Sequence, residues 1–221
     1  MRDAWVSGDS ALASLWYCKR SNRPLDPCQC PKTRHHVFRL VVMSVAPIET
    51  KNLKLIPHSP QHLVALIEGA DLYACSFGWP PANGLRDFYV SKEVSAQWLA
   101  QLRSATAGDP WTHGFGVVHV ASGKVIGAAG FKGPPGADGA AEIAYGIVPE
   151  YQGRGYATEA AGALVEFALR SGCVRTARAH TLPQKNASTR VLTKCGFEFV
   201  GEVNDPEDGP VWRWEKVLQS V

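Results

Sequence analysis

Residues 142–160, EIAYGIVPEYQGRGYATEA, join a strand-like run to a glycine-rich turn and the start of a helix. The run 140–148, AAEIAYGIV, is short and apolar, and Pro149 should end its pairing because proline cannot donate a hydrogen bond to a sheet. After Gly155 the apolar residues recur every three or four positions as far as Gly172, a typical helix end. The stretch therefore predicts a strand, a turn and a helix in succession.

The glycine turn fits neither of the common nucleotide-binding motifs. A P-loop requires a lysine after its last glycine, and Tyr156 stands there instead. A dinucleotide-binding turn requires a third glycine or alanine where this chain has Thr158. That turn also needs an acidic residue on the next strand, and the segment 174–182, VRTARAHTL, contains none. Both nucleotide motifs are therefore excluded.

What the turn offers to a ligand is its backbone. The first amides of a helix have no partner within that helix, and Gly153 and Gly155 would let a ligand approach them closely. Arg154 adds a positive charge. These features predict an anion site, most naturally one for a pyrophosphate. The alternative is a tight turn without a ligand, because glycines commonly mark turns.

From Ile48 onward the sequence predicts a mixed α/β domain. Strands are expected at 48–57, 113–122, 124–133, 140–148, 174–182, 197–203 and 210–218. Helices are expected at 59–70, 91–105, 157–169 and 186–195. Ser122-Gly123 predicts a hairpin turn, and one crossover helix follows the strand at 140–148.

Composition and charge argue against a membrane-spanning or nucleic-acid-binding protein. The chain has 221 residues, of which 45% are hydrophobic and 19% charged, as expected for a soluble globular protein. No uninterrupted apolar stretch reaches the ~18 residues of a membrane span. The net charge of +3 arises from the basic residues before Met43, so the predicted domain lacks the basic excess of a nucleic-acid-binding protein. We therefore expect neither a nucleic-acid nor a membrane partner.

Residues 1–42 differ from the rest of the chain. They are rich in proline, cysteine and charge without sustained periodicity, so we expect a poorly ordered N-terminal extension before a domain at 43–221, with Met43 a candidate initiator. Cys28, Cys30 and the pair His35-His36 have spacings that suit zinc poorly, and no metal is predicted. The six cysteines follow no disulfide framework, which favours free thiols and a cytoplasmic location.

Two stretches together resemble the GNAT superfamily of acyl-CoA-dependent N-acyltransferases. They are EIAYGIVPEYQGRGYATEA at 142–160 and HTLPQKNASTRVLTKCGFEFVGE at 180–202. Within this superfamily the chain is most similar to the ribosomal-protein N-terminal alanine acetyltransferases (RimJ/RimL type), over about Ile48 to Leu218. The glycine signature Q/R-x-x-G-x-G/A is present in the shifted form QGRGYA at 152–157. The resemblance implies a three-layer fold, with a mixed, mostly antiparallel sheet of about seven strands flanked by helices and split at the cofactor.

The resemblance also implies how acetyl-CoA would bind. Its pyrophosphate would lie on the backbone amides of the turn, at Gln152, Gly153, Arg154, Gly155, Tyr156 and Ala157. Its pantetheine arm would meet the backbone of Ile147 and Val148, where the strand leaves its neighbour. Asn186 resembles a residue that binds the pantetheine, and a helix N-cap is the alternative reading of that asparagine.

Glu142 and Ser188 are the candidate catalytic residues. Glu142 matches a glutamate that many relatives carry and would act as a base, through water, with a pKa raised by its apolar neighbours; a solvated surface residue is the alternative. Ser188 matches a proposed general acid and would protonate or orient the departing sulfur. Leu192 stands where other branches carry a tyrosine, which removes that tyrosine from the mechanism. His180 ends its strand and could reach the acceptor site, but a structural histidine is expected.

The sequence thus predicts an N-acetyltransferase that moves an acetyl group from acetyl-CoA to a primary amine by direct attack. The acceptor is expected to be a protein N-terminus or a small-molecule amine, recognised by the loop at 75–88, CSFGWPPANGLRDF. A non-catalytic acyl-CoA-binding sensor and a plain interaction domain are the alternatives. A homodimer is left open.

Overall fold

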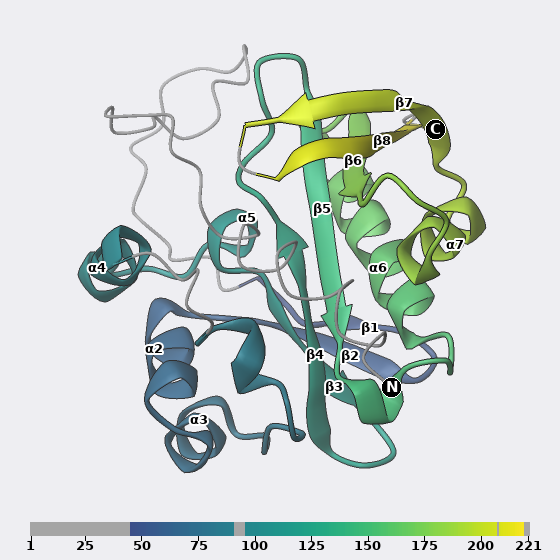
Figure 1. Cartoon of the computed structure of the whole chain (residues 1–221). Coiled ribbons are helices and arrows are strands. Elements are labelled where there is room, and N and C mark those ends of the chain that lie inside the picture. The colour runs from purple at the N-terminus through teal and green to yellow at the C-terminus, as the bar shows by residue number, and fades with distance from the viewer. Residues whose placement is uncertain (1–44, 91–95, 207, 219–221) are drawn as a thin grey trace.

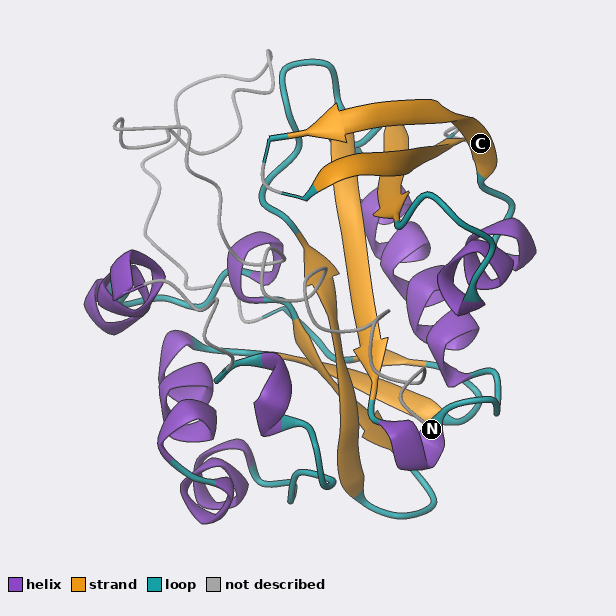
Figure 2. Cartoon of the chain, viewed as in Figure 1, coloured by secondary structure: helices purple, strands orange, loops and turns teal. Residues whose placement is uncertain are grey.

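The computed structural model describes residues 45–90, 96–206 and 208–218 (Figure 1). The extension predicted at 1–42, its cysteines and histidines, and the candidate initiator Met43 lie outside the described residues. The described part forms a sheet with helices on both of its sides (Figures 1 and 2).

The sheet has eight strands in the described residues, in the order β1-β2-β3-β4-β5-β6-β8-β7. Their bounds are β1 (Ile48–Glu49), β2 (Leu53–Pro57), β3 (Phe115–His119), β4 (Lys124–Phe131), β5 (Ala140–Ile147), β6 (Thr176–Thr181), β7 (Glu198–Asp205) and β8 (Gly209–Val217). All neighbours pair antiparallel except β5 and β6, which are parallel. The mixed, mostly antiparallel sheet predicted from the sequence is confirmed.

The helices divide between the two faces of the sheet. Their bounds are α2 (Pro60–Glu68), α3 (Ala70–Phe77), α4 (Ala96–Ser104), α5 (Pro110–His113), α6 (Tyr156–Ser171) and α7 (Ala187–Lys194), with short 3₁₀ turns η2 (Arg86–Phe88) and η3 (Pro149–Tyr151). On β3, Phe115 faces the α6 side, where it contacts Phe167. The next residue, Gly116, faces Phe77 of α3, and a Cβ at this glycine would lie only 2.7 Å from the Phe77 ring. The sheet is therefore the middle of three layers.

The structure differs from the sequence expectations at the first strand and at two helices, α3 and α5, neither of which was predicted. The single strand predicted at 48–57 is a tight hairpin of β1 and β2, closed by the Thr50 N–H donating to the Leu53 carbonyl. This split raises the strand number from the expected seven to eight. Helix α3 was not predicted: Gly69 ends α2, and the chain at once starts a second helix that Gly78 ends with a φ of 84°.

The helix predicted after the glycine turn is α6, which crosses between β5 and β6. Its inner face is built from small residues and leucine, and Ala160, Ala161, Leu164 and Ala168 are fully buried. Alanine allows the helix to approach the sheet closely, and the phenyl ring of Phe167 fills the space beside Phe115 and Phe131 on the strands. Gly172 ends the helix in the left-handed conformation, as the sequence predicted.

Strands β5 and β6 separate soon after they begin to pair. Their ladder joins Ala140–Glu142 to Thr176–Arg178 and goes no further. On its other side, β5 stays paired with β4 as far as Ile147. The second half of β5 therefore borders a gap in the sheet, and the glycine turn lies at the end of that gap.

Candidate active site

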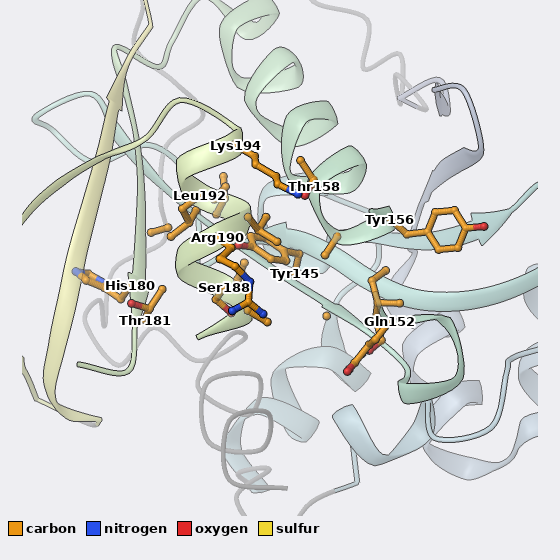
Figure 3. Close-up of a pocket in the computed structure, with 18 of the residues that line it drawn as sticks. Tyr145, Gln152, Tyr156, Thr158, His180, Thr181, Ser188, Arg190, Leu192 and Lys194 are labelled. Atoms are coloured by element: carbon orange, nitrogen blue, oxygen red, sulfur yellow. The ribbon is translucent and has the colours of Figure 1, made fainter. Parts of the chain in front are cut away.

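A cavity of about 620 Å³ occupies the gap between β5 and β6. Its walls come from the second half of β5, the turn before α6, the end of β6 and one side of α7 (Figure 3). Phe88, Lys132, Asp208 and Val211 also line it. The cavity thus joins the glycine turn at one end to Glu142 at the other, along a path on which Ser188 also lies.

The glycine turn presents open backbone to solvent. Gly153 and Gly155 have φ values of 75° and 85°, and a Cβ at either position would meet no atom within 4 Å. The first amide of α6 with a helical partner is that of Glu159, which donates to the Gly155 carbonyl. The amides before it, at Tyr156, Ala157 and Thr158, have no acceptor within the helix. The turn therefore has the shape and polarity of an anion cradle, and its left-handed conformation gives a second reason for both glycines.

Two side chains of the turn fold away from the cradle. Arg154 donates to the Glu150 carbonyl at 3.1 Å and its guanidinium carbon lies 5.5 Å from the centre of the Tyr151 ring. The Tyr156 hydroxyl lies 2.9 Å from Nε2 of His119, the last residue of β3. The Arg154 side chain, which was expected from the sequence to add positive charge to the anion site, is instead engaged with Glu150 and Tyr151.

Helix α7 supplies two cations that the sequence argument missed. Arg190 and Lys194 are one helical turn apart and both line the cavity. Figure 3 shows Lys194 reaching toward Thr158 at the start of α6. Their spacing of four residues was the available signal, because it places both side chains on one side of the helix.

The end of β5 is held by contacts within the chain. The Ile147 carbonyl accepts a hydrogen bond from Nε2 of Gln152 at 2.7 Å. Val148 is fully buried, its N–H donates to the Ile126 carbonyl, and its carbonyl accepts from the Tyr151 N–H. Ile147 lines the cavity, whereas Val148 lies behind it. The contacts of both residues with a pantetheine arm stay predictions.

Asn186 is the N-cap of α7. Its Oδ1 accepts from the Thr189 N–H at 3.0 Å, and the Thr189 hydroxyl oxygen accepts from the Asn186 N–H at 3.1 Å. This is the alternative that the sequence left open, and its contact with a cofactor stays a prediction. The cap fixes the first turn of α7 and with it Ser188, which lines the cavity.

Glu142 is the centre of a polar cluster at the far end of the cavity. Its Oε1 lies 2.9 Å from Nζ of Lys132 and 3.0 Å from Nδ1 of His180. The pKa of Glu142 is lowered: burial alone would raise it, but the contacts with His180 and Lys132 outweigh that effect. The expected raised pKa is therefore wrong. The buried neighbours Ala141 and Ile143 point to the opposite face of the strand, and Glu142 faces the two nitrogen groups.

The loop expected to recognise the acceptor is mostly packed into the fold. Phe77 is buried at the end of α3, with its ring 4.9 Å from that of Tyr73. Trp79 is half-buried against the β3–β4 turn, where a Cβ at Gly123 would lie 3.7 Å from its ring. Phe88 is the residue of this loop that reaches the cavity. The role of the loop stays a prediction that now depends on Phe88.

Two further properties concern the described residues as a whole. Within residues 45–90, 96–206 and 208–218, no group of three or more histidine, cysteine, aspartate or glutamate residues is arranged to hold a metal ion. No helix in these ranges is both long and apolar enough to cross a membrane.

Comparison with known proteins agrees with this geometry. A family described as "Acetyltransferase (GNAT) domain" matches residues 52–198. The uncharacterized N-acetyltransferase p20 of Bacillus licheniformis is 28% identical over 142 residues, which are 64% of this chain and 80% of p20.

Solved structures share the fold. The ribosomal-protein-S5-alanine acetyltransferase of Vibrio fischeri has a TM-score of 0.55 at 19% identity, over 80% of this chain and 98% of its own. RimL, a ribosomal L7/L12 α-N-protein acetyltransferase solved with coenzyme A, has a TM-score of 0.56 at 17% identity, over 78% of this chain and 98% of its own. With the family match covering more than half of its length, the chain belongs to the GNAT family of acetyltransferases.

Proposed function

We propose that the protein transfers the acetyl group of acetyl-CoA to a primary amine by direct attack of the amine on the thioester. One observation carries this proposal. A single cavity leads from an anion cradle on the glycine turn, past Ser188, to an ionised carboxylate at Glu142. The phosphates of a thioester such as acetyl-CoA need an anion site. The amine that attacks this thioester must lose a proton, so it needs a basic group in the same cavity.

The cofactor would lie along the gap between β5 and β6. Its pyrophosphate would accept hydrogen bonds from the backbone amides of residues 152–157, where both glycines leave the space open. Arg190 and Lys194 would add positive charge from α7. The pantetheine would follow the backbone near Ile147, which borders the gap. The solved complex of RimL with coenzyme A supports this assignment by analogy of fold.

The chemistry requires a neutral amine and a proton for the departing sulfur. The acceptor ammonium would lose its proton at the end of the cavity where Glu142 lies, directly or through a water molecule. The amine nitrogen would then form its bond to the thioester carbon, and the bond from carbon to sulfur would break. Ser188 would donate to the departing thiolate or orient it, because this side chain lines the cavity between the two ends.

A covalent cysteine intermediate is not part of the proposal. Cys195 is half-buried at the end of α7, and its thiol donates to the Thr158 carbonyl at 3.5 Å. Burial raises the pKa of this thiol, which lowers its content of the reactive thiolate. The absence of an activated thiol near the cradle, among the residues that the structure describes, favours direct attack.

The acceptor would be a protein N-terminal amine or a small-molecule amine. An assay of free-thiol release from acetyl-CoA across N-terminal peptides and small amines tests the proposal, with acetylated product identified by mass spectrometry. The proposal predicts equal amounts of thiol and acetylated amine for at least one acceptor class. Tight CoA binding without turnover on any acceptor would instead identify a non-catalytic acyl-CoA sensor. A cytoplasmic location stays a prediction.

A further inference from the structure

We propose that His180 is the group that takes the proton from the acceptor ammonium, and that Glu142 holds the imidazole in position for this step. The inference rests on the proposed function and assigns its least defined step. Both residues line the same cavity, and they come together from adjacent strands that leave each other at this point.

The contact with Glu142 favours one tautomer of the His180 imidazole. Nδ1 of His180 lies 3.0 Å from Oε1 of Glu142, so a carboxylate at this distance favours the tautomer with the proton on Nδ1 and the lone pair on Nε2. Nδ1 is buried and makes no well-formed hydrogen bond in the described structure. Such contacts commonly tighten when substrate binds. The histidine would thereby be oriented as in a carboxylate–histidine pair, with Nε2 available to the acceptor.

Glu142 is poorly suited to be the base itself. The same oxygen, Oε1, contacts both Nζ of Lys132 and Nδ1 of His180. These contacts lower the pKa of the carboxyl group, and a strongly ionised carboxylate accepts a proton weakly at neutral pH. Its negative charge is better used to stabilise the imidazolium that forms beside it.

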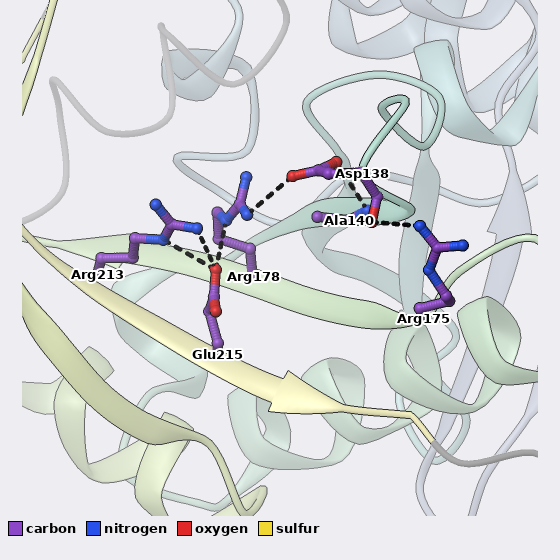
Figure 4. A network of polar contacts seen from close by, with 6 residues as sticks. All are labelled: Asp138, Ala140, Arg175, Arg178, Arg213 and Glu215. Atoms are coloured by element: carbon purple, nitrogen blue, oxygen red, sulfur yellow. Dashed lines mark hydrogen bonds and ion pairs between the residues drawn. The ribbon is translucent and has the colours of Figure 1, made fainter.

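The charged groups around His180 are largely committed to one another. Arg213 lies directly opposite His180 on β8 and contacts Glu215. Arg178, on the same face of β6, bridges Glu215 at 2.8 Å and Asp138 at 3.2 Å (Figure 4). The two arginines therefore share the carboxylate of Glu215, and Arg178 contacts Asp138 as well. Lys132 and Asp208 also line the cavity, and Glu142 is the carboxylate that contacts the imidazole.

The proposed step is balanced in protons and bonds. Nε2 of His180 accepts one proton from the acceptor ammonium, which leaves a neutral amine and an imidazolium beside Glu142. The amine forms its bond to the acetyl carbon, the carbon–sulfur bond breaks, and the second proton, which the nitrogen loses as the amide forms, passes to the departing thiolate. The imidazolium then returns its proton to solvent, so that one turnover yields an acetylated amine, free CoA thiol and one released proton.

The test compares wild type with His180→Gln on primary amines of graded pKa, at one pH. An amine that is already neutral at that pH needs no base, whereas a protonated one does. His180→Gln should therefore lose about 10²- to 10⁴-fold in kcat/KM on high-pKa amines, and much less on low-pKa amines. Glu142→Gln should show the same dependence on amine pKa, because the imidazole would lose its orienting partner. The dissociation constant for CoA should stay unchanged in both variants.

Arg178→Gln is the matched control, since Arg178 shares the strand and face of His180 but lies outside the residues that line the cavity. Any loss it causes should be equal across the amine series. An equal loss across the series for His180→Gln, or no loss, would overturn the inference while leaving the proposed function intact. A wild-type protein that acetylates no amine would overturn the proposed function, and the inference with it.

Discussion

Glu159, in the first turn of α6, accepts hydrogen bonds from both the backbone N–H and the side-chain amide of Asn52, at 2.6 and 2.9 Å. The Thr50 hydroxyl donates to the same carboxylate at 2.6 Å. These contacts tie the helix that begins at the glycine turn to the β1–β2 hairpin. The carboxylate also lies where the helix dipole favours negative charge. The position of the anion cradle thus depends on a contact across more than 100 residues of sequence.

Glu159→Gln should lower the stability of the fold by about 1 kcal/mol, because a neutral amide cannot replace the charge-assisted hydrogen bonds. For a domain of this size the midpoint of thermal unfolding should fall by about 2–4 °C. Glu166→Gln is the control on the same helix, since Glu166 forms an exposed pair with Arg170 and such pairs contribute little. Equal shifts for both variants would contradict the assigned role.

The same contact predicts a dependence on pH. Burial alone would raise the pKa of Glu159 in the folded protein, but the hydrogen bonds from Asn52 and Thr50 outweigh it and lower this pKa. The unfolded chain then binds the proton first as pH falls, so this contribution is present above the ordinary glutamate pKa and is lost on further acidification. Unfolding by urea between pH 6 and pH 3 should show a smaller decline in Glu159→Gln than in wild type. An identical decline would contradict the prediction.

His58 makes a second, larger contribution to acid sensitivity. It is buried, its Nε2 lies 2.7 Å from the Tyr73 hydroxyl, and burial lowers its pKa to about 3. The unfolded chain binds this proton near the ordinary histidine pKa, so stability should fall as pH drops below about 6.5, by about 1.4 kcal/mol per pH unit.

Burial also lowers the pKa of His62 and His113, so the full slope includes both of them. His58→Gln should reduce the slope of the unfolding free energy against pH by up to the contribution of one proton, which is about 1.4 kcal/mol per pH unit. His119→Gln serves as the control, because His119 is not fully buried. A slope unchanged in His58→Gln would show that His58 does not stay neutral in the fold.

Two substitutions at Gly155 separate charge from backbone strain. Asn and Asp have nearly the same size, and both tolerate the left-handed φ of 85° better than other side chains. Gly155→Asp would place a carboxylate beside the pyrophosphate, so its dissociation constant for CoA should exceed that of Gly155→Asn by about tenfold or more. The difference should shrink as salt is added. Equal affinities in calorimetry would refute the placement of the phosphate site.

Lys194→Gln should weaken CoA binding by about fivefold, which corresponds to about 1 kcal/mol for one partly exposed contact with a phosphate. It should also reduce the salt dependence of binding, because one cation has been removed. Arg170→Gln, at the far end of α6, is the control. Equal binding by all three proteins would show that Lys194 makes no contact with the phosphates.

The sequence predicted those parts of the site that are local. A strand, a turn and a helix follow one another within residues 140–172, so periodicity and the two glycines sufficed to predict the elements that form the proposed anion cradle. The N-cap at Asn186 is local as well, and it was one of two readings that capping preference allowed.

The end of the cavity at Glu142 could not be predicted in the same way. Lys132, Glu142 and His180 meet through the register of three strands, and pairing register is not visible in any one of them. The apolar neighbours of Glu142 suggested an apolar environment, but adjacent strand residues point to opposite faces. The sequence neighbours of Glu142 therefore lie on the face away from it, and its spatial neighbours set its charge.

The proposed function requires that one cavity bring acetyl-CoA and an amine together for direct transfer. The most direct measurement follows an isotopically labelled acetyl group by mass spectrometry, after the protein is mixed with labelled acetyl-CoA and an amine acceptor. Direct transfer predicts that the label appears on the acceptor nitrogen, in an amount equal to the free CoA thiol. It also predicts that the mass of the protein stays unchanged. Label retained in acetyl-CoA with every acceptor, or found on the protein as a covalent intermediate, would contradict it.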